Sequence, residues 1–276
     1  MPIKVFTKEN QANGNFNNGQ ILEKKPIGFP QDGGQLSPYS NLFYWAHAWA
    51  PANDSTIGLH PHRGFETITY MLNGKFRHKD SAGNEGFLSD GSVQWMTAGK
   101  GVIHSEMPEQ TDGLIKGFQL WLNLPKEKKM ISPKYNDINA DQIPCINFDG
   151  GNVKIISGEF SGVTGPGEPH TGMLYFDIHL DAKSELILPI ENGWNGFIYV
   201  YDGKINILDK EINKKYLAVL SQDGELILYT KEHEARFILV AGEPLNEPVA
   251  RGGPFVMNTK GEILKAFSDY QEGKFA

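Results

Sequence analysis

Two pairs of potential metal ligands stand out in this chain, and a single residue separates the members of each pair. The first pair is His60 and His62 in GLHPHRGFET, and the second is His104 and Glu106 in GKGVIHSEMP. Side chains two residues apart in a β-strand share a face, so two neighbouring strands can direct three imidazoles and one carboxylate at one point. This ligand set suits a divalent metal such as Fe, Mn, Ni, Cu or Zn, with positions left open for substrate, water or O₂. A closed structural zinc site is disfavoured because such sites rely on cysteine.

Glu66 complicates the ligand count because it follows His62 by four residues and therefore shares its strand parity. Three roles are open: a metal ligand, an acceptor for the imidazole N–H of a ligand, or a buried carboxylate with a raised pKa. We favour the second role, in which Glu66 supports a ligand histidine without binding the metal itself.

Two other reactive side chains are expected to take no part in this chemistry. Cys145 is the only cysteine, stands between proline and isoleucine, and is expected to be a buried, inert thiol. His78 follows the hairpin signal Asn73-Gly74 and is expected to be exposed. A single cysteine excludes an intramolecular disulfide and favours a reducing compartment.

The composition describes a turn-rich globular protein and excludes several functional classes. Of 276 residues, 31 are glycine and 16 proline, and the formal net charge is −7. An acidic balance without a basic cluster argues against nucleic-acid binding. No apolar stretch approaches the roughly 18 to 20 residues of a membrane span, and the N-terminus lacks a signal-like apolar region. We therefore expect a cytoplasmic protein that binds neither nucleic acid nor membrane.

Short apolar runs between turns predict an all-β fold, and the chain contains a degenerate internal repeat. The sequence Gly64-Phe65-Glu66 is answered by Gly193-Trp194-Asn195, at an offset of 129 residues (193 − 64) that persists through the following hairpin. At this offset His60 and His62 become Pro189 and Glu191. The second half has therefore lost the histidine pair, and the metal site is expected to be single.

The expected organisation is two β domains followed by one helix. Residues 1–130 are expected to form the metal-binding domain, residues 131–152 a connection, and residues 153–276 a second domain without ligands. Near the end of the chain, Thr259 and Glu262 have capping-box spacing, and the apolar residues after them follow a helical period.

At these residues the chain resembles the pirin family. HPHRGFETITY and WMTAGKGVIHSEMP are similar to the N-terminal metal site of pirins, and GGPFVMNTKGEILKAFSDYQEGKF is similar to the pirin C-terminus. The resemblance implies a bicupin, with two antiparallel jelly-roll barrels and metal in the N-terminal barrel only. It places the metal ligands on His60, His62, His104 and Glu106, and it favours Glu106 over Glu66 as the carboxylate ligand.

The resemblance also implies alternative functions. Some pirins are associated with quercetin 2,3-dioxygenase activity, which opens a flavonol ring with O₂ and releases carbon monoxide, and others with transcriptional co-regulation or regulation of a metabolic enzyme complex. We expect an Fe(II)-dependent dioxygenase of the quercetinase type, with Mn, Ni, Cu, Co or Zn as alternative metals. Its substrates would be O₂ and a small aromatic, flavonol-like molecule, and Glu106 would bind the metal and accept the proton of the substrate hydroxyl.

Two other hypotheses stay open at this point. The first is an iron-binding, redox-responsive regulator that acts through a protein partner. The second is a non-catalytic cupin that binds metal incidentally. The sequence leaves the oligomeric state open, with a monomer as one option.

Overall fold

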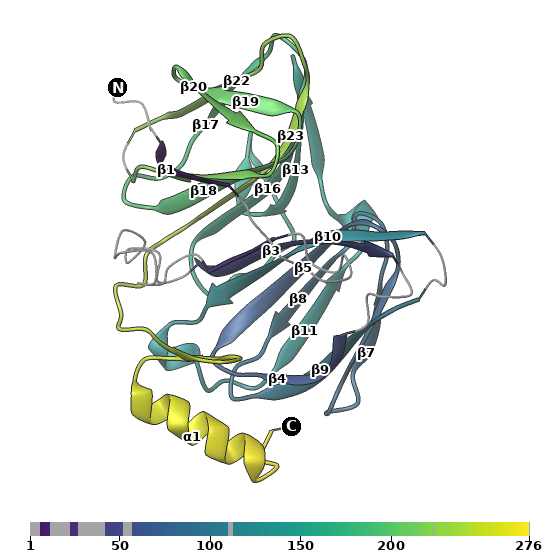
Figure 1. Ribbon diagram of the computed structural model, residues 1–276, viewed down its shortest axis with the longest axis vertical. Helices are drawn as coiled ribbons and strands as arrows, with labels where there is room; N and C mark the ends of the chain where they lie inside the picture. Colours follow the sequence, from purple (N-terminus) through teal and green to yellow (C-terminus); the bar gives the residue numbers. More distant parts are fainter. Residues whose placement is uncertain are drawn as a thin grey trace. The chain divides into compact units, whose positions relative to one another are not determined.

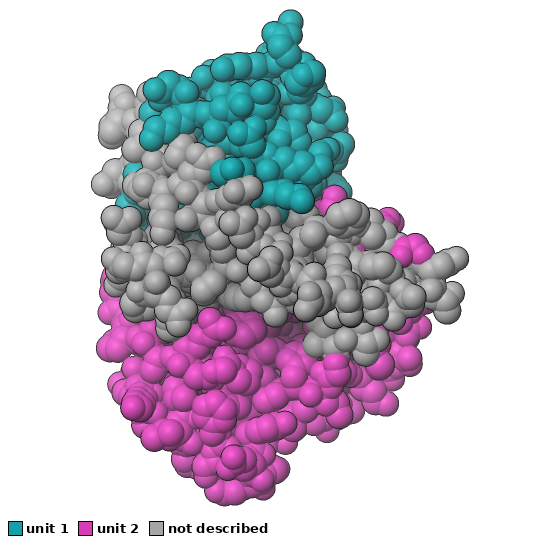
Figure 2. Space-filling view, viewed as in Figure 1, with its two compact units in different colours: residues 1–12, 141–244 teal, residues 13–140, 245–276 magenta. Residues whose placement is uncertain are grey.

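The chain folds into two compact units (Figure 2), of which unit 1 comprises residues 1–12 and 141–244 and unit 2 residues 13–140 and 245–276. The structure is a computed structural model that describes residues 6–11, 23–26, 42–51, 57–109, 113–222 and 224–275. These units differ from the expected domains 1–130 and 153–276, because the N-terminal strand joins the second half and the C-terminal helix joins the first. Pairing between distant segments, not chain order, decides where the two ends of the chain belong.

Unit 2 is built from two antiparallel sheets (Figure 1), with strand orders β11-β8-β5-β10-β3-β2 and β4-β9-β6-β7. Their strands are β2 (Glu23–Pro26), β3 (Leu42–Pro51), β4 (Ile57–His62), β5 (Phe65–Asn73), β6 (Phe76–Asp80), β7 (Glu85–Leu88), β8 (Val93–Thr97), β9 (Val102–Pro108), β10 (Leu114–Asn123) and β11 (Lys134–Ile138). The unit also contains a 3₁₀ turn at Lys126–Lys128, the hairpin of β24 (Ala250–Gly252) and β25 (Phe255–Met257), and helix α1 (Lys260–Gln271).

Unit 1 also has two main antiparallel sheets, with strand orders β1-β21-β18-β23-β16-β13-β12 and β17-β22-β19-β20. Their strands are β1 (Phe6–Gln11), β12 (Cys145–Phe148), β13 (Gly151–Ser157), β16 (Met173–Leu180), β17 (Glu185–Leu188), β18 (Asn195–Asp202), β19 (Lys204–Ile207), β20 (Lys210–Asn213), β21 (Tyr216–Leu220), β22 (Leu226–Tyr229) and β23 (Ala235–Gly242). A small hairpin of β14 (Glu159–Phe160) and β15 (Val163–Thr164) and a 3₁₀ turn at Ala140–Gln142 complete the elements.

The strand orders show the internal repeat directly. β4-β9-β6-β7 in unit 2 corresponds to β17-β22-β19-β20 in unit 1, and β8-β5-β10-β3 corresponds to β21-β18-β23-β16. β11 completes the large sheet of unit 2 beside β8, whereas in unit 1 the equivalent place beside β21 is taken by β1 from the start of the chain. The expected all-β fold of two barrels with one C-terminal helix is confirmed.

Helix α1 begins as its sequence predicts. The Thr259 side chain accepts a hydrogen bond from the backbone N–H of Glu262, and the Glu262 side chain accepts one from the backbone N–H of Thr259. This capping box satisfies amide groups that the first helical turn leaves unpaired. Within the described part of the chain, no helix is both long and apolar enough to cross a membrane.

Cys145 departs from its expected environment. Its thiol is exposed, because Ile146 and Phe148 of β12 pack against the core of unit 1, and Cys145 alternates with them along the strand. The expectation of a buried cysteine was wrong.

Candidate metal centre

The two histidine strands, β4 and β9, are antiparallel neighbours, and their register places His60 directly opposite His104. His62 lies two residues further along β4 on the same face. One ligand nitrogen from each of the three rings lies within 4.8 Å of the others, and the ring centroids are 4.3 to 5.0 Å apart. The structure therefore brings together the three histidines that strand parity selected.

The imidazole nitrogens are placed to accept a cation. His104 is fully buried, and neither of its ring nitrogens has a hydrogen-bond partner, while Nδ1 of His62 is also buried without one. Desolvation, followed by repulsion from His60, lowers the pKa of His62 to about 3, and desolvation likewise lowers the pKa of His104. Both rings are therefore neutral at neutral pH, which is the form that binds a metal. Buried nitrogens without partners are costly unless a ligand satisfies them.

Glu106 is buried on the same face of β9 as His104, but it is not among the three residues whose ligand atoms cluster within 4.8 Å. The amide of Gln119 on β10 donates to Oε1 (3.2 Å) and Oε2 (3.4 Å) of Glu106, and the Thr69 hydroxyl donates to Oε1 (3.5 Å). Burial raises the pKa of Glu106, while nearby His60 and the Gln119 hydrogen bond act in the opposite direction. The carboxylate is thus held by neutral donors beside the histidine cluster.

Glu66 is fully buried on β5 and accepts a hydrogen bond from the Thr97 hydroxyl to Oε1 at 2.7 Å. The two residues are paired across β5 and β8. Glu66 is absent from the cluster of ligand atoms, so a role as a supporting carboxylate stays a prediction.

His78 differs from its expected position, because it is buried in unit 2 with only 2% of its surface exposed. It pairs with Glu106 across β6 and β9, its Nε2 lies 2.9 Å from Oδ2 of Asp137, and its ring stacks on Tyr135 at 5.0 Å between centroids. The alternation that buries Glu106 and His104 also turns His78 inward. The expectation of exposure was wrong because the hairpin residues after Asn73-Gly74 enter the barrel wall.

Aromatic side chains lie against His62. The Trp121 and Phe65 rings are 5.3 and 5.1 Å from the His62 ring and 4.5 Å from each other. Nε1 of Trp121 donates to Oε1 of Gln119, so this wall is connected to the residue that holds Glu106. Trp121 and Gln119 were not predicted from the sequence. The one available signal was that they lie two residues apart on β10 and therefore share a face.

The residues present fit a divalent metal. Three imidazoles converge on one point, and His104 is fully buried with both nitrogens unsatisfied. This donor set is typical of Fe, Mn, Co, Ni, Cu and Zn sites in proteins.

Unit 1 contains a second cluster of potential ligand atoms, formed by His179, Asp181 and Glu234 within 4.8 Å. Nε2 of His179 is 3.1 Å from Oε2 of Glu234 and 3.7 Å from Oδ1 of Asp181. The two carboxylate side chains are 55% and 60% exposed, so water competes for them, and a surface hydrogen bond explains the arrangement.

Comparison with known proteins places this chain in a family. The family description Pirin matches residues 31–122, and Pirin C-terminal cupin domain matches residues 175–276. A pirin-like protein from Caulobacter vibrioides is 45% identical over 219 residues, covering 78% of this chain and 79% of that protein. Mouse pirin is 41% identical over 221 residues, covering 78% and 76%.

Among solved structures, a quercetin 2,3-dioxygenase from Acinetobacter baumannii matches 99% of both chains with a TM-score of 0.90 and 34% identity. A bacterial pirin from Escherichia coli in complex with nickel(II) shares the fold, with a TM-score of 0.67 and 20% identity over 86% of this chain and 99% of that one. On the strength of its relatives and of the two matched domains, the chain belongs to the pirin family of bicupins.

Proposed function

We propose that this pirin is a metal-dependent dioxygenase of the quercetin 2,3-dioxygenase type, which acts on flavonol-like aromatic substrates. The observation that carries the proposal is the buried His104, whose two ring nitrogens lack partners while two further imidazoles converge on it. We assign His60, His62, His104 and Glu106 as metal ligands, and Fe(II) as the native metal. The 34% identity over 99% of the chain to a quercetin 2,3-dioxygenase supports the reaction type.

Glu106 would act on the substrate as well as on the metal. Its carboxylate is buried, and burial raises its pKa, so it is a stronger base than an exposed glutamate. Gln119 donates to the carboxylate and fixes its orientation toward the histidine cluster. In the proposed reaction, a Glu106 oxygen accepts the hydroxyl proton of the flavonol.

A divalent metal, when bound, supplies the Lewis acidity that stabilises the substrate in its enolate form. The chain itself supplies access and shape. His60 is only partly buried, whereas His62 and His104 are buried, so the cluster is reached from the side of His60. The partly buried Trp121 ring lies beside His62 and offers an aromatic surface for a flat ligand, and the fully buried Phe65 packs against it.

The test uses protein stripped of metal, reloaded anaerobically with Fe(II), and then mixed with quercetin and air. The loaded wild type is expected to consume quercetin with release of carbon monoxide, and the stripped protein is not. Glu106→Gln is expected to lower kcat/KM about 100-fold or more, because it removes a general base. The matched control is Glu66→Gln, which alters another buried carboxylate of the same unit and is expected to cost about tenfold.

The enzyme proposal fails if quercetin disappears equally fast with and without metal. If instead the iron-loaded protein shows no turnover, capture of one protein partner only in one iron oxidation state would favour the regulatory hypothesis. The proposed assignment of Glu106 fails separately if Glu106→Gln and Glu66→Gln have the same effect.

A further inference from the structure

The C-terminal segment, residues 250–275, packs against the two turns that flank the histidine strands of unit 2. It consists of hairpin β24–β25, helix α1 and a short tail, and we call it the C-terminal clamp (Figure 1). Ile103, the neighbour of His104 on β9, packs against the apolar cluster of the clamp. That cluster consists of Phe255, Met257, Ile263, Ala266 and Phe275.

The first contacted turn joins β4 to β5 and directly follows His62. The backbone N–H of Val256 donates to the carbonyl of Arg63 at 3.0 Å. Gly64 has a φ of +86°, and a Cβ at that position would lie 2.0 Å from the carbonyl oxygen of Val256. Only glycine therefore allows the clamp to approach the ligand turn this closely.

Lys129 joins the same turn to the clamp from inside the unit. Its amino group is buried and donates to the carbonyl oxygens of Gly64 (2.8 Å) and Val256 (3.0 Å) and to Oδ1 of Asn123 (2.5 Å). Three acceptors around one amino group match its donor capacity. The turn after His62 is thus held by both backbone and side-chain contacts to the clamp.

Arg63 extends this connection to the second turn, between β8 and β9, which precedes His104. Its Nε donates to the carbonyl of Lys100 at 2.6 Å, and its Nη1 donates to Oδ2 of Asp269 on α1 at 2.8 Å. The guanidinium also lies 4.4 Å from the centre of the Phe275 ring. The side chains of Arg63 and Asp269 are only 5% and 9% exposed, so this ion pair is shielded from water.

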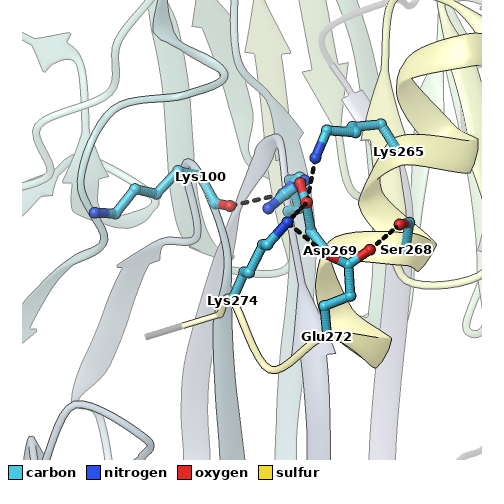
Figure 3. A network of polar contacts seen from close by, with 7 residues as sticks. Lys100, Lys265, Ser268, Asp269, Glu272 and Lys274 are labelled. Carbon is cyan, nitrogen blue, oxygen red and sulfur yellow. Dashed lines mark hydrogen bonds and ion pairs between the residues drawn. The ribbon is translucent and has the colours of Figure 1, made fainter.

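Asp269 is the point where the charges of this network meet (Figure 3). The Asp269 carboxylate forms ion pairs with Arg63, Lys265 and Lys274. Figure 3 shows the amino groups of the two lysines beside it. Hydrogen bonds from Lys265 and Arg63 lower the pKa of Asp269 to about 2, so it is ionised at neutral pH. The Lys265 side chain is 64% exposed, whereas Arg63 is buried, so Arg63 depends on Asp269 far more than Lys265 does.

We propose that the C-terminal clamp positions the metal ligands, and that Arg63 and Asp269 are its positioning residues. The Arg63 side chain links its own turn, which follows His62, to the turn before His104 and to helix α1, so it holds the ends of the two ligand strands in a fixed arrangement. This inference rests on the metal site proposed above. The proposal gives the C-terminal segment, which follows unit 1 in the chain but belongs to unit 2, a role in the metal site of unit 2.

The test measures Co(II) binding by metal-free, full-length protein. Co(II) affinity is measured by competition with a chelator, ligand geometry by the visible absorption of bound Co(II), and stability by urea unfolding of the metal-free form. Asp269→Asn is expected to weaken Co(II) affinity about tenfold and to change the absorption spectrum, because supporting contacts tune metal sites by about this amount. The matched control, Lys265→Met, removes an exposed partner of the same carboxylate and is expected to leave affinity within about twofold and the spectrum unchanged.

The proposal is overturned if Asp269→Asn lowers the stability but keeps the wild-type affinity and spectrum, since the clamp would then be a structural element only. If Asp269→Asn does not fold, Arg63→Lys replaces it, because a lysine cannot bridge Lys100 and Asp269 as the guanidinium does, and the same weakening is expected. Failure of the wild type to bind Co(II) would instead contradict the metal site itself, and the clamp proposal with it.

Discussion

The two units share one strand order, yet the equivalent strand pairs carry opposite kinds of side chain. In unit 2, β4 and β9 place His60 opposite His104. In unit 1, β17 and β22 place Leu188 opposite Leu226, and both leucines are fully buried in an apolar core. The same strand framework therefore carries a polar site in unit 2 and an apolar core in unit 1.

This difference shows that the histidine site lowers the stability of unit 2 when no metal is bound. Leu188 and Leu226 gain free energy by leaving water, whereas the buried nitrogens of His104 lose hydrogen bonds without finding partners in the protein. A metal would supply the missing interactions. In unit 2, the C-terminal clamp also packs against the ligand strand β9 through Ile103. The core of unit 1 is filled by aliphatic and aromatic side chains.

The strongest way to break the comparison is to make unit 2 resemble unit 1 with His104→Leu. We expect metal binding to be lost and the unfolding free energy of the metal-free protein to rise by about 1–3 kcal/mol, because an unsatisfied buried polar group is removed. Metal analysis and urea unfolding measure the two effects. Wild-type metal affinity in this variant would contradict the assignment of His104.

The reverse experiment places a cavity in the equivalent strand pair of unit 1. Leu226→Ala is expected to lower the unfolding free energy by about 2–5 kcal/mol, since it removes a fully buried side chain, while the metal content per folded chain stays unchanged. Urea unfolding and metal analysis of the folded fraction would show this. A parallel loss of metal from folded protein would mean that unit 1 takes part in binding.

A smaller effect is expected from the residue that orients Glu106. Gln119→Met removes the donor to both carboxylate oxygens and should lower kcat/KM with quercetin about tenfold. The control is Gln222→Met in unit 1, which removes an amide that donates to Asn195 and should leave kcat/KM unchanged. Equal effects of the two substitutions would remove Gln119 from the site.

A pH-dependent effect on stability is expected from the buried lysine of unit 2. Burial lowers the pKa of Lys129 to about 7, against about 10.5 in the unfolded chain, so the unfolded state binds more protons between these values. The unfolding free energy should therefore rise with pH across this window, by at most about 1.4 kcal/mol per pH unit from this residue. Urea unfolding at pH 7 to 10 should show a shallower rise in Lys129→Met. An unchanged slope would place the pKa of Lys129 near its ordinary value.

The sequence was informative wherever the relevant geometry is local. Alternation along a strand was enough to predict that His60, His62 and His104 share a face, and capping-box spacing was enough to predict the start of α1. The same alternation was available for His78, but its burial depends on β6 pairing with β9, which no local pattern specifies.

Long-range pairing also explains the other differences. Gln119 reaches Glu106 only because β10 lies across the unit from β9. The assignment of the two chain ends to units has the same origin, since β1 pairs with β21 and Asp269 of α1 binds Arg63. Such partners are fixed by the closed fold as a whole.

The most direct test of the contrast between the two units is a crystal structure of the protein loaded with Co(II), with anomalous scattering recorded at the cobalt edge. We expect one strong anomalous peak per chain, bounded by His60, His62, His104 and Glu106 in unit 2. A peak beside His179, Asp181 and Glu234 in unit 1 with none at the histidine strands, or no ordered peak at all, would contradict it.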